Sequence, residues 1–269
     1  MRHVDFEPSK LRGEDATWWQ QWSARADAEA REVQKARGTG LQRSFDPAIL
    51  EELKRWLLHN VFYNKCAFCE YDAVPRHYYG DPEHYRPESE VTEVHGGHVE
   101  PVMMPDGHPH PGYYWVAHDW RNVFPLCARC GRSGKGSQFP IKAERVSDPR
   151  RGPDPEILDR IEVPQLLNPY NDHPADHLKF GVKGTITALT DRGEASINAF
   201  HLNDEPFVVE RQSQQEKAWS YLLLIAQSTL QGPSIGKLLK RSMELYTGPK
   251  ARFSQAVIDY LEIKVRDLA

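Results

Sequence analysis

Two short cysteine motifs, Cys66-Ala-Phe-Cys69 and Cys127-Ala-Arg-Cys130, decide how this chain can fold. Each C-x-x-C motif places two thiols on one tight turn, so the pair can supply four ligands to one metal ion. The motifs use all four cysteines of the chain and are separated by 57 residues. A compact zinc ribbon has a gap of only ~15–20 residues. The spacing therefore predicts a long-range zinc staple that closes the intervening segment into one core.

We interpret the predicted zinc site as structural. Four thiolates fill a tetrahedral shell, whereas a catalytic zinc keeps one position open for water. The zinc would hold the residues after Cys130 against the segment that carries His84. The alternative is a pair of redox-active or buried dithiols, but a thioredoxin-like motif needs a βαβ setting that the sequence lacks.

The remaining composition is that of an ordinary globular protein. The chain has 269 residues, of which 39% are hydrophobic and 27% charged, with a net charge of −4. This length is enough for one large domain or two modest ones. No apolar run approaches the ~18–20 residues that span a bilayer, and the first residues lack the apolar segment of a signal peptide. We therefore expect a cytoplasmic protein without a membrane partner.

Helices are predicted before the first cysteine motif. Residues 14–37 contain no Gly or Pro and predict a long helix. Its three tryptophans, Trp18, Trp19 and Trp22, either pack against the core or form a partner interface. Asp46 as N-cap and Pro47 as the first helical residue predict a second helix over 46–62.

The regions after residue 90 show weaker signals. Residues 91–112 are rich in Gly and Pro and predict a solvated loop, although they contain four histidines. Residues 147–165 are expected to be a connector, and residues 177–190 predict two short strands that turn near Lys183-Gly184. Helices are expected at 205–230, 233–246 and 250–267. We divide the chain into an N-terminal helical segment (1–62), a core (63–146) and a C-terminal connector, hairpin and helices (147–269).

Glu83, His84 and Asn122 form the candidate catalytic set. Phosphodiester hydrolysis needs a base to activate water and a cation to stabilise charge on the phosphate. A neutral histidine suits the first task, and a carboxylate can hold a hard divalent ion for the second. Neighbouring residues of a regular strand face opposite sides, so the strand must end or bulge here, as Pro82 and Pro87 favour. Asn122 can hold a loop by bonding backbone groups on both sides.

A longer pattern around these residues resembles the HNH endonucleases, which have a ββα-metal fold. More specifically, it resembles the PtuB-like nuclease subunit of Septu-type and retron-associated anti-phage systems, over roughly residues 60–205. The pattern comprises Cys66-Ala-Phe-Cys-Glu70, Glu83-His-Tyr-Arg-Pro87, Tyr114-Trp-Val-Ala-His-Asp-Trp-Arg-Asn-Val-Phe-Pro-Leu-Cys127, Lys135-Gly-Ser-Gln-Phe-Pro140, Leu166-Leu-Asn-Pro169 and Ile197-Asn-Ala-Phe-His-Leu-Asn203.

The resemblance implies an α+β fold: a zinc-stapled ββα-metal (HNH) core flanked by N-terminal helices and a mainly helical C-terminal region. It also implies that His84 is the general base, that Glu83 helps to hold a catalytic Mg²⁺ or Mn²⁺, and that Asn122 is the central Asn. The expected partner is an ATPase subunit of a defence complex, which would bind and control the nuclease.

The chain departs from the HNH pattern at its third signature position. That residue, Asn or His, directly follows the last cysteine in the family, whereas this chain has Gly131. Another side chain can substitute, with His118, Asp119 or Ser133 as candidates. Alternatively, water can fill the coordination position, which magnesium tolerates, or catalysis is weak or lost. We expect an active enzyme because the other signature residues are present.

A local excess of basic residues favours nucleic acid as the substrate. Residues 121–152 contain eight basic residues and two acidic ones in a chain that is acidic overall. Such a patch is what binding to a phosphate backbone needs, although a solvated basic face is the alternative. We expect DNA rather than RNA. A non-catalytic zinc module that binds nucleic acid or protein is the alternative function. The predicted nucleic-acid contacts are Arg86, Arg121, Arg129, Arg132 and Lys135.

Overall fold

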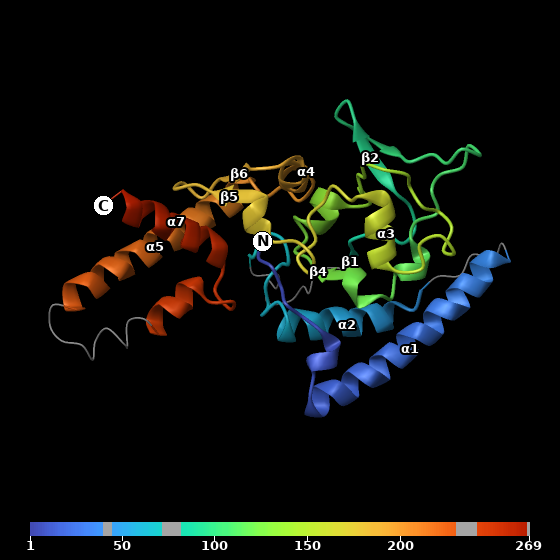
Figure 1. The fold of residues 1–269 in the computed structure, drawn as a ribbon, viewed down its shortest axis with the longest axis horizontal. Helices are drawn as coiled ribbons and strands as arrows, with labels where there is room; N and C mark the ends of the chain where they lie inside the picture. The colour runs from blue at the N-terminus through green and yellow to red at the C-terminus, as the bar shows by residue number, and fades with distance from the viewer. Residues whose placement is uncertain (40–44, 72–81, 230–240, 268–269) are drawn as a thin grey trace.

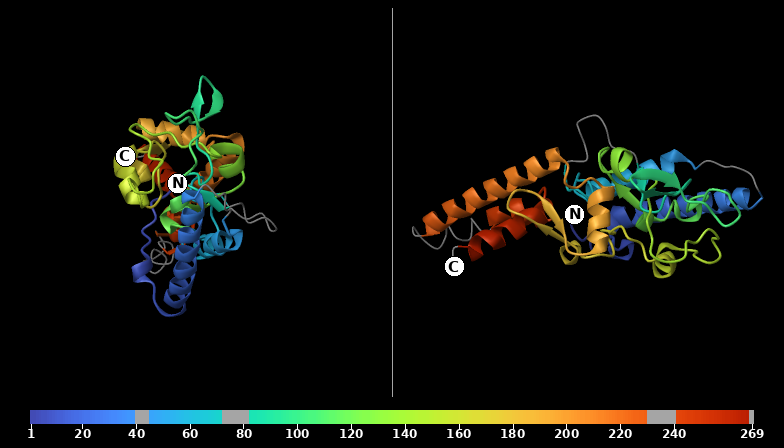
Figure 2. Two further views of the ribbon diagram at one scale, coloured as in Figure 1. Left: turned by 90° about the vertical axis from the view of Figure 1, so that its right-hand side faces the viewer. Right: turned by 90° about the horizontal axis from the view of Figure 1, so that it is seen from above.

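The computed structural model describes residues 1–39, 45–71, 82–229 and 241–267 and shows an elongated molecule (Figure 1). One end is a mixed body that contains α1, α2 and α3 with two strand pairs. The other end is an arm built from α5 and α7, and a view from above shows the same division (Figure 2). Small two-stranded sheets and helices alternate, so the predicted α+β class is confirmed.

Helices α1 (Gly13–Gly38) and α2 (Pro47–Asn60) agree with the two predicted N-terminal helices. The Asp46 side chain accepts a hydrogen bond from the Ala48 N–H at 2.9 Å. A cap of this kind stabilises a helix by about 1 kcal/mol. The apolar face of α2 is buried through Ile49, Leu50, Leu53, Leu57 and Leu58.

The tryptophans of α1 pack inward, which confirms the packing interpretation. Trp22 is buried, and its Nε1–H donates to Ile49 O at 3.0 Å. Trp18 stacks on Trp56 of α2, with ring centroids 5.1 Å apart. Each such aromatic pair stabilises the packing by about 0.5–1.5 kcal/mol beyond its buried area, so this cluster joins α1 to α2.

Strands β1 (Pro82–His84) and β4 (Val123–Pro125) form an antiparallel pair in which β1 carries Glu83 and His84, and Asn122 directly precedes β4. His84 lies opposite Val123, and all of β4 is buried. Strand β1 ends at His84, which agrees with the break expected between the flanking prolines. After β4 the chain enters the second cysteine motif and a short π-helical turn, Gly131–Lys135.

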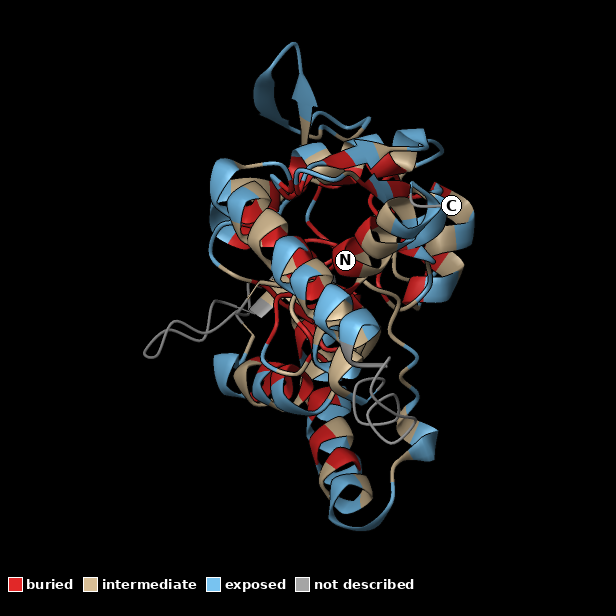
Figure 3. Cartoon of the chain, turned by 90° about the vertical axis from the view of Figure 1, so that its left-hand side faces the viewer, coloured by how far each residue is buried: buried red, intermediate tan, exposed pale blue. Residues whose placement is uncertain are grey.

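Residues 91–112 contain a β-hairpin where we predicted a solvated loop. Strand β2 (Thr92–His95) pairs with β3 (His98–Pro101) across Gly96 and Gly97, which both have positive φ. A two-residue hairpin turn of type I′ requires positive φ at both central residues, which glycine adopts without strain. The hairpin is largely exposed (Figure 3), but His110 further along the segment is buried.

The predicted C-terminal hairpin is present as β5 (Leu178–Phe180) and β6 (Ile186–Ala188). The expected connector instead contains a helix, α3 (Pro155–Glu162), which Asp154 caps through the Glu156 and Ile157 N–H groups. Helix α4 (Asp191–Ala199) precedes α5 (Glu205–Thr229) and α7 (Ser254–Arg266), and the last two match predicted helices. The predicted helix at 233–246 lies partly outside the described residues, and 241–247 are helical.

One continuous cluster of buried side chains runs through the three predicted segments. It includes Trp22 and Leu57 from the first segment, Phe124 from the second, and Phe200 and Phe253 from the third. The cysteines belong to the same cluster, so the predicted zinc site would lie inside a shared core rather than on a separate module. Within the described residues, no helix is both long and apolar enough to cross a bilayer.

Candidate metal centre and histidine–carboxylate site

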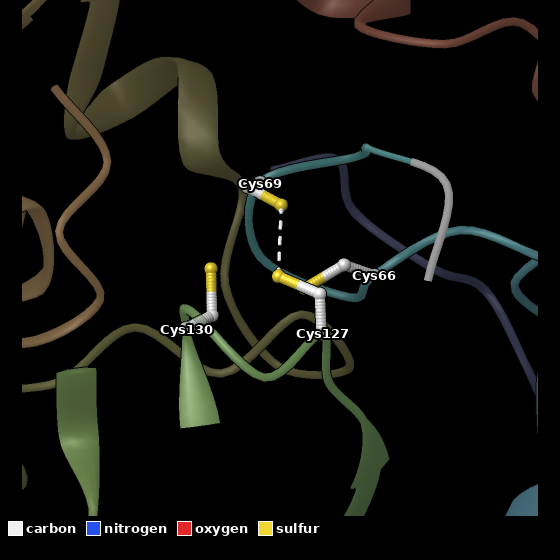
Figure 4. Close-up of side chains that lie close together, drawn as sticks. All are labelled: Cys66, Cys69, Cys127 and Cys130. Carbon is white, nitrogen blue, oxygen red and sulfur yellow. Dashed lines mark hydrogen bonds between the residues drawn. The ribbon is translucent and has the colours of Figure 1, made fainter. Parts of the chain in front are cut away.

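The four cysteines converge on one point although 57 residues separate the two motifs (Figure 4). Their sulfur atoms all lie within 4.8 Å of one another. Cys127 is partly exposed and the other three cysteines are buried. The first turn closes where the Glu70 N–H donates to Cys66 O at 3.1 Å, with Glu70 at a φ of 60°.

The sulfur geometry fits a tetrahedral zinc ion. A Zn–S bond of about 2.3 Å places neighbouring sulfur atoms about 3.8 Å apart in a tetrahedron. The Sγ atoms of Cys69 and Cys127 lie 3.7 Å apart. Four thiolates would complete the coordination shell and leave no position for a substrate. The cluster can therefore hold the predicted zinc ion in a structural role.

The environment of the cysteines includes a buried cation that the sequence did not suggest. Burial raises the pKa of the Cys69 and Cys130 thiols, whereas hydrogen bonds from the neighbouring thiols lower the pKa of Cys127. Arg211 of α5 is buried beside them, and its guanidinium donates to Leu202 O. Zinc held by four thiolates would carry a formal charge of −2, which this guanidinium would partly offset.

Both ring nitrogens of His84 have polar partners. Nε2 lies 3.0 Å from Ala117 O, and Nδ1 lies 2.9 Å from Glu88 Oε2. A carbonyl oxygen only accepts hydrogen bonds, so Nε2 carries a proton and donates it to Ala117 O. The ionised Glu88 carboxylate also only accepts, so its contact requires a proton on Nδ1, and Nδ1 offers a lone pair only after that proton leaves. The ring is buried, so these two contacts fix its orientation.

Glu88 is a site residue that sequence reasoning missed. Burial would raise its pKa, but the hydrogen bond and charge of His84 lower the pKa of Glu88 to about 2, so its carboxylate is ionised at neutral pH. Its side chain remains 33% exposed. Glu88 follows His84 by four residues, a spacing that implies contact only on a helix, and this backbone is not helical.

The Glu83 carboxylate lies against the backbone of Gly131. A Cβ atom added to Gly131 would be 2.6 Å from Glu83 Oε1, so a larger residue there competes with Glu83 for the same space. Lys135, at the other end of the π-helical turn, is also buried. Burial lowers the pKa of its ammonium to about 8, while the charges of Glu83 and Glu88 act in the opposite direction.

A catalytic divalent ion would find one protein ligand of suitable chemistry in Glu83. Among the described residues, the cysteines are the one group of three or more potential ligand side chains close enough to share an ion. Magnesium is commonly held by one or two carboxylates together with water and substrate oxygens. Glu83 alone fits that mode of binding, whereas Gly131 contributes no side-chain ligand.

Asn122 joins the two segments that carry the His84 contacts. Its Oδ1 accepts from the Arg86 N–H at 2.7 Å, and its Nδ2 donates to Arg86 O and Val116 O at 3.1 and 3.2 Å. These bonds confirm the prediction that Asn122 bonds backbone on both sides. Because Val116 directly precedes Ala117, Asn122 also places the carbonyl that orients His84.

The three candidates for replacing the third signature side chain have different surroundings. His118 is buried with both ring nitrogens unbonded to any described residue, and burial lowers its pKa to about 4. Asp119 accepts from the Arg121 guanidinium at 2.6 Å. Ser133 lies exposed on the π-helical turn.

The predicted nucleic-acid contacts fall into two groups. Arg86 is fully buried, bonded to Asp159 at 2.6 Å and Glu162 at 3.1 Å, and Lys135 is also buried. Neither side chain presents a surface to a nucleic acid, since both are buried, and the charge of Arg86 is paired inside the protein. The second group is at least partly accessible and consists of Arg121, Arg129 and Arg132.

These features define a four-cysteine cluster that can hold a metal ion and a histidine–carboxylate site on a two-stranded antiparallel pair. The chain is similar to a protein of Bacillus mycoides (strain KBAB4) named Septu protein PtuB, with 33% identity over 168 residues. The match covers 61% of this chain and 51% of that protein, so the chain spans about half the length of the curated relative it matches. No family model matches the chain, and no solved structure gives a significant match. The similarity supports a relationship with the Septu-type protein.

Proposed function

We propose that this chain is a metal-dependent endonuclease of the HNH type that cuts DNA in anti-phage defence. The observation that carries the proposal is the fixed orientation of His84, whose Nε2–H is bonded to Ala117 O, which leaves Nδ1 as the nitrogen that can exchange a proton. The similarity to Septu protein PtuB supports the defence role. The order of β1, β4 and the π-helical turn is compatible with a ββα core stapled by zinc.

In the proposed reaction, His84 acts as a general base. Its Nδ1 accepts a proton from a water molecule while the water oxygen forms a bond to phosphorus and the bond to the leaving ester oxygen breaks. Glu83 would hold Mg²⁺ or Mn²⁺, which supplies charge stabilisation at the phosphate when bound. Asn122 acts at a distance by fixing the backbone that positions Ala117 O.

We also propose that an ATPase partner binds the C-terminal arm. Two features favour the arm over α1. The tryptophans of α1 pack into the protein, whereas α5 and α7 carry exposed apolar side chains that include Val209, Leu223 and Val265. Exposed apolar side chains on adjacent helices are common in protein interfaces.

A non-catalytic zinc module is the second candidate function. It is favoured by Gly131, which provides no metal ligand, and by Glu88, which lies at the nitrogen of His84 that a general base would use. In this case the chain would bind nucleic acid or protein without cleaving it.

A cleavage assay separates the two functions. Duplex DNA, single-stranded DNA and tRNA are incubated with the zinc-loaded chain and the proposed ATPase partner, with Mg²⁺ or Mn²⁺. We expect cleavage of duplex DNA that His84→Ala abolishes. The control is His98→Ala, which changes an exposed histidine on the hairpin. Equal background cleavage by the wild type and His84→Ala would contradict the nuclease assignment.

A further inference from the structure

We propose that Glu88 is an autoinhibitory cap on His84, and that the histidine becomes available as a base only when the Glu88 side chain moves away. The contact is between Glu88 Oε2 and His84 Nδ1, which lie 2.9 Å apart. A water molecule that gives its proton to Nδ1 must occupy a hydrogen-bonding position at that nitrogen. The carboxylate therefore occupies the place that the reactive water needs.

A supporting carboxylate would require a different arrangement. In a carboxylate–histidine dyad, the acid binds one ring nitrogen and the other nitrogen faces the reacting group. Here the other nitrogen, Nε2, is bonded to Ala117 O. That carbonyl is fixed by the neighbouring bond from Asn122 Nδ2 to Val116 O. Nε2 is therefore not available to a water molecule, and Nδ1 is the nitrogen that the water would have to reach. Because Glu88 occupies Nδ1, its contact blocks the base rather than assisting it.

The structure allows the Glu88 side chain to move while its backbone stays in place. The Tyr113 N–H donates to Pro87 O at 2.7 Å, directly before Glu88. A Cβ atom added to Gly112 would lie 2.4 Å from Glu88 C, so the two backbones are in close contact. The side chain, in contrast, is 33% exposed. Rotation of the side chain toward solvent is therefore enough to uncover Nδ1, without moving the loop.

Charges inside the site hold the cap closed. The ionised Glu88 carboxylate is attracted by His84 and by the buried ammonium of Lys135. A hydrogen bond between ionic partners is stronger than one between neutral groups. The cap is thus a stable resting contact that can open by a side-chain rotation. The consequence for cleavage rests on the proposed function, but the capped state of His84 does not.

The test compares the reactivity of His84 with diethyl pyrocarbonate in the zinc-loaded chain and in Glu88→Ala. This reagent modifies an imidazole nitrogen that has a free lone pair, and peptide mass spectrometry identifies the modified histidine. We expect His84 to react about tenfold faster in Glu88→Ala, the factor that loss of a hydrogen bond to a charged group produces. Glu88→Gln, which keeps the shape but not the charge, should give an intermediate rate. The control is Glu90→Ala, an exposed glutamate in the same loop.

Two results would overturn the cap. One is equal modification of His84 in the wild type and Glu88→Ala, with unchanged thermal unfolding. The other is a loss of DNA cleavage in Glu88→Ala with folding intact, because Glu88 would then assist the reaction. Faster modification together with faster cleavage supports the cap. Faster modification without cleavage in any variant also supports it, and contradicts the nuclease proposal instead.

Discussion

The Glu83 carboxylate and the α-carbon of Gly131 share one small space between β1 and the π-helical turn. A Cβ atom added to Gly131 would lie 2.6 Å from Glu83 Oε1 and 2.9 Å from Glu83 Cγ. The Glu83 side chain therefore fills the space that a larger residue at position 131 would need. The departure from the HNH pattern at this position is thus coupled to the placement of the proposed metal ligand.

Gly131→Ala should therefore impair metal-dependent cleavage more than stability. The atoms that a Cβ meets are at the end of a flexible side chain, so Glu83 can rotate away at a cost of about 1 kcal/mol or less. A displaced ligand lowers the cleavage rate about 10–100-fold, as expected for a misplacement near 1 Å. Cleavage is measured over a series of Mg²⁺ concentrations beside thermal unfolding. Ala128→Ser, an exposed change three residues earlier, is the control, and full activity of Gly131→Ala would refute this coupling.

Zinc removal should destabilise the whole chain, because the cysteine cluster lies inside the shared core. Elemental analysis should find about one zinc per chain in the wild type and less in Cys130→Ser. The variant should lose about 3 kcal/mol or more of stability, since structural zinc contributes folding free energy directly. Urea unfolding measures this loss. Ala128→Ser, an exposed change within the same motif, should retain the zinc; equal zinc content in all three proteins would exclude a four-thiolate site.

The sequence predicted the parts of the fold that depend on local signals. Asp46 and Pro47 define the start of α2 because capping and proline geometry act within one turn. The convergence of the cysteines was also predictable, since metal ligation restricts possible folds. Helix α3 was missed because the prolines and charges around it resemble those of a connector, although Asp154 and Pro155 provide the same start signal.

The sequence predicted the contacts of a site residue only where the side-chain groups of that residue restrict what it can bond. Asn122 was expected to bond backbone on two sides, and it does so. Glu88 could not be found in the same way, because its contact with His84 depends on the non-helical path of the chain between them. Arg211 could not be found because its role depends on a contact between distant segments. The burial of Arg86 also could not be predicted from local sequence, since its partners Asp159 and Glu162 lie more than seventy residues further along the chain.

Asn122→Ala should destabilise the protein and loosen His84. The substitution removes three hydrogen bonds and leaves the Arg86 N–H, Arg86 O and Val116 O groups buried without that partner. The expected loss is about 2–4 kcal/mol, because each buried unsatisfied group costs about 1–3 kcal/mol and some relaxation occurs. Chemical denaturation measures it. Asn60→Ala removes a single exposed bond to Trp56 O and should change stability by much less; comparable losses would show that Asn122 does not hold the loop.

Stability should fall in mild acid because of His110. Its Nε2–H donates to Val146 O and its Nδ1 accepts from the Gly112 N–H, so the buried ring is neutral. Burial lowers the pKa of His110 to about 4, below the ordinary value of 6.5. The unfolded state therefore binds more protons between these values, and the contribution of His110 is complete above pH 6.5 and declines as the pH falls toward 4.

The decline should reach up to about 3 kcal/mol at the low end of this range, given about 1.4 kcal/mol for each pKa unit. It is measured as the free energy of unfolding from pH 7.5 to 4, and His110→Gln should flatten the curve relative to the wild type. His108→Gln, an exposed histidine in the same segment, should not. Parallel curves for the wild type and His110→Gln would show that another group controls the acid sensitivity.

Nucleic-acid binding should depend on the accessible arginines and not on Arg86. Arg129 is partly exposed, and its ion pair with Asp204 at 3.1 Å is of a kind that contributes about 0–1 kcal/mol. A phosphate can therefore replace the carboxylate partner. Arg129→Ala and Arg132→Ala should each weaken binding to any DNA sequence and reduce the slope of log affinity against log salt by about 1.

Fluorescence anisotropy with a duplex at several salt concentrations measures both effects. Arg160→Ala, an exposed arginine paired on α3, is the control, and an equal salt slope in all variants would place the DNA contact elsewhere.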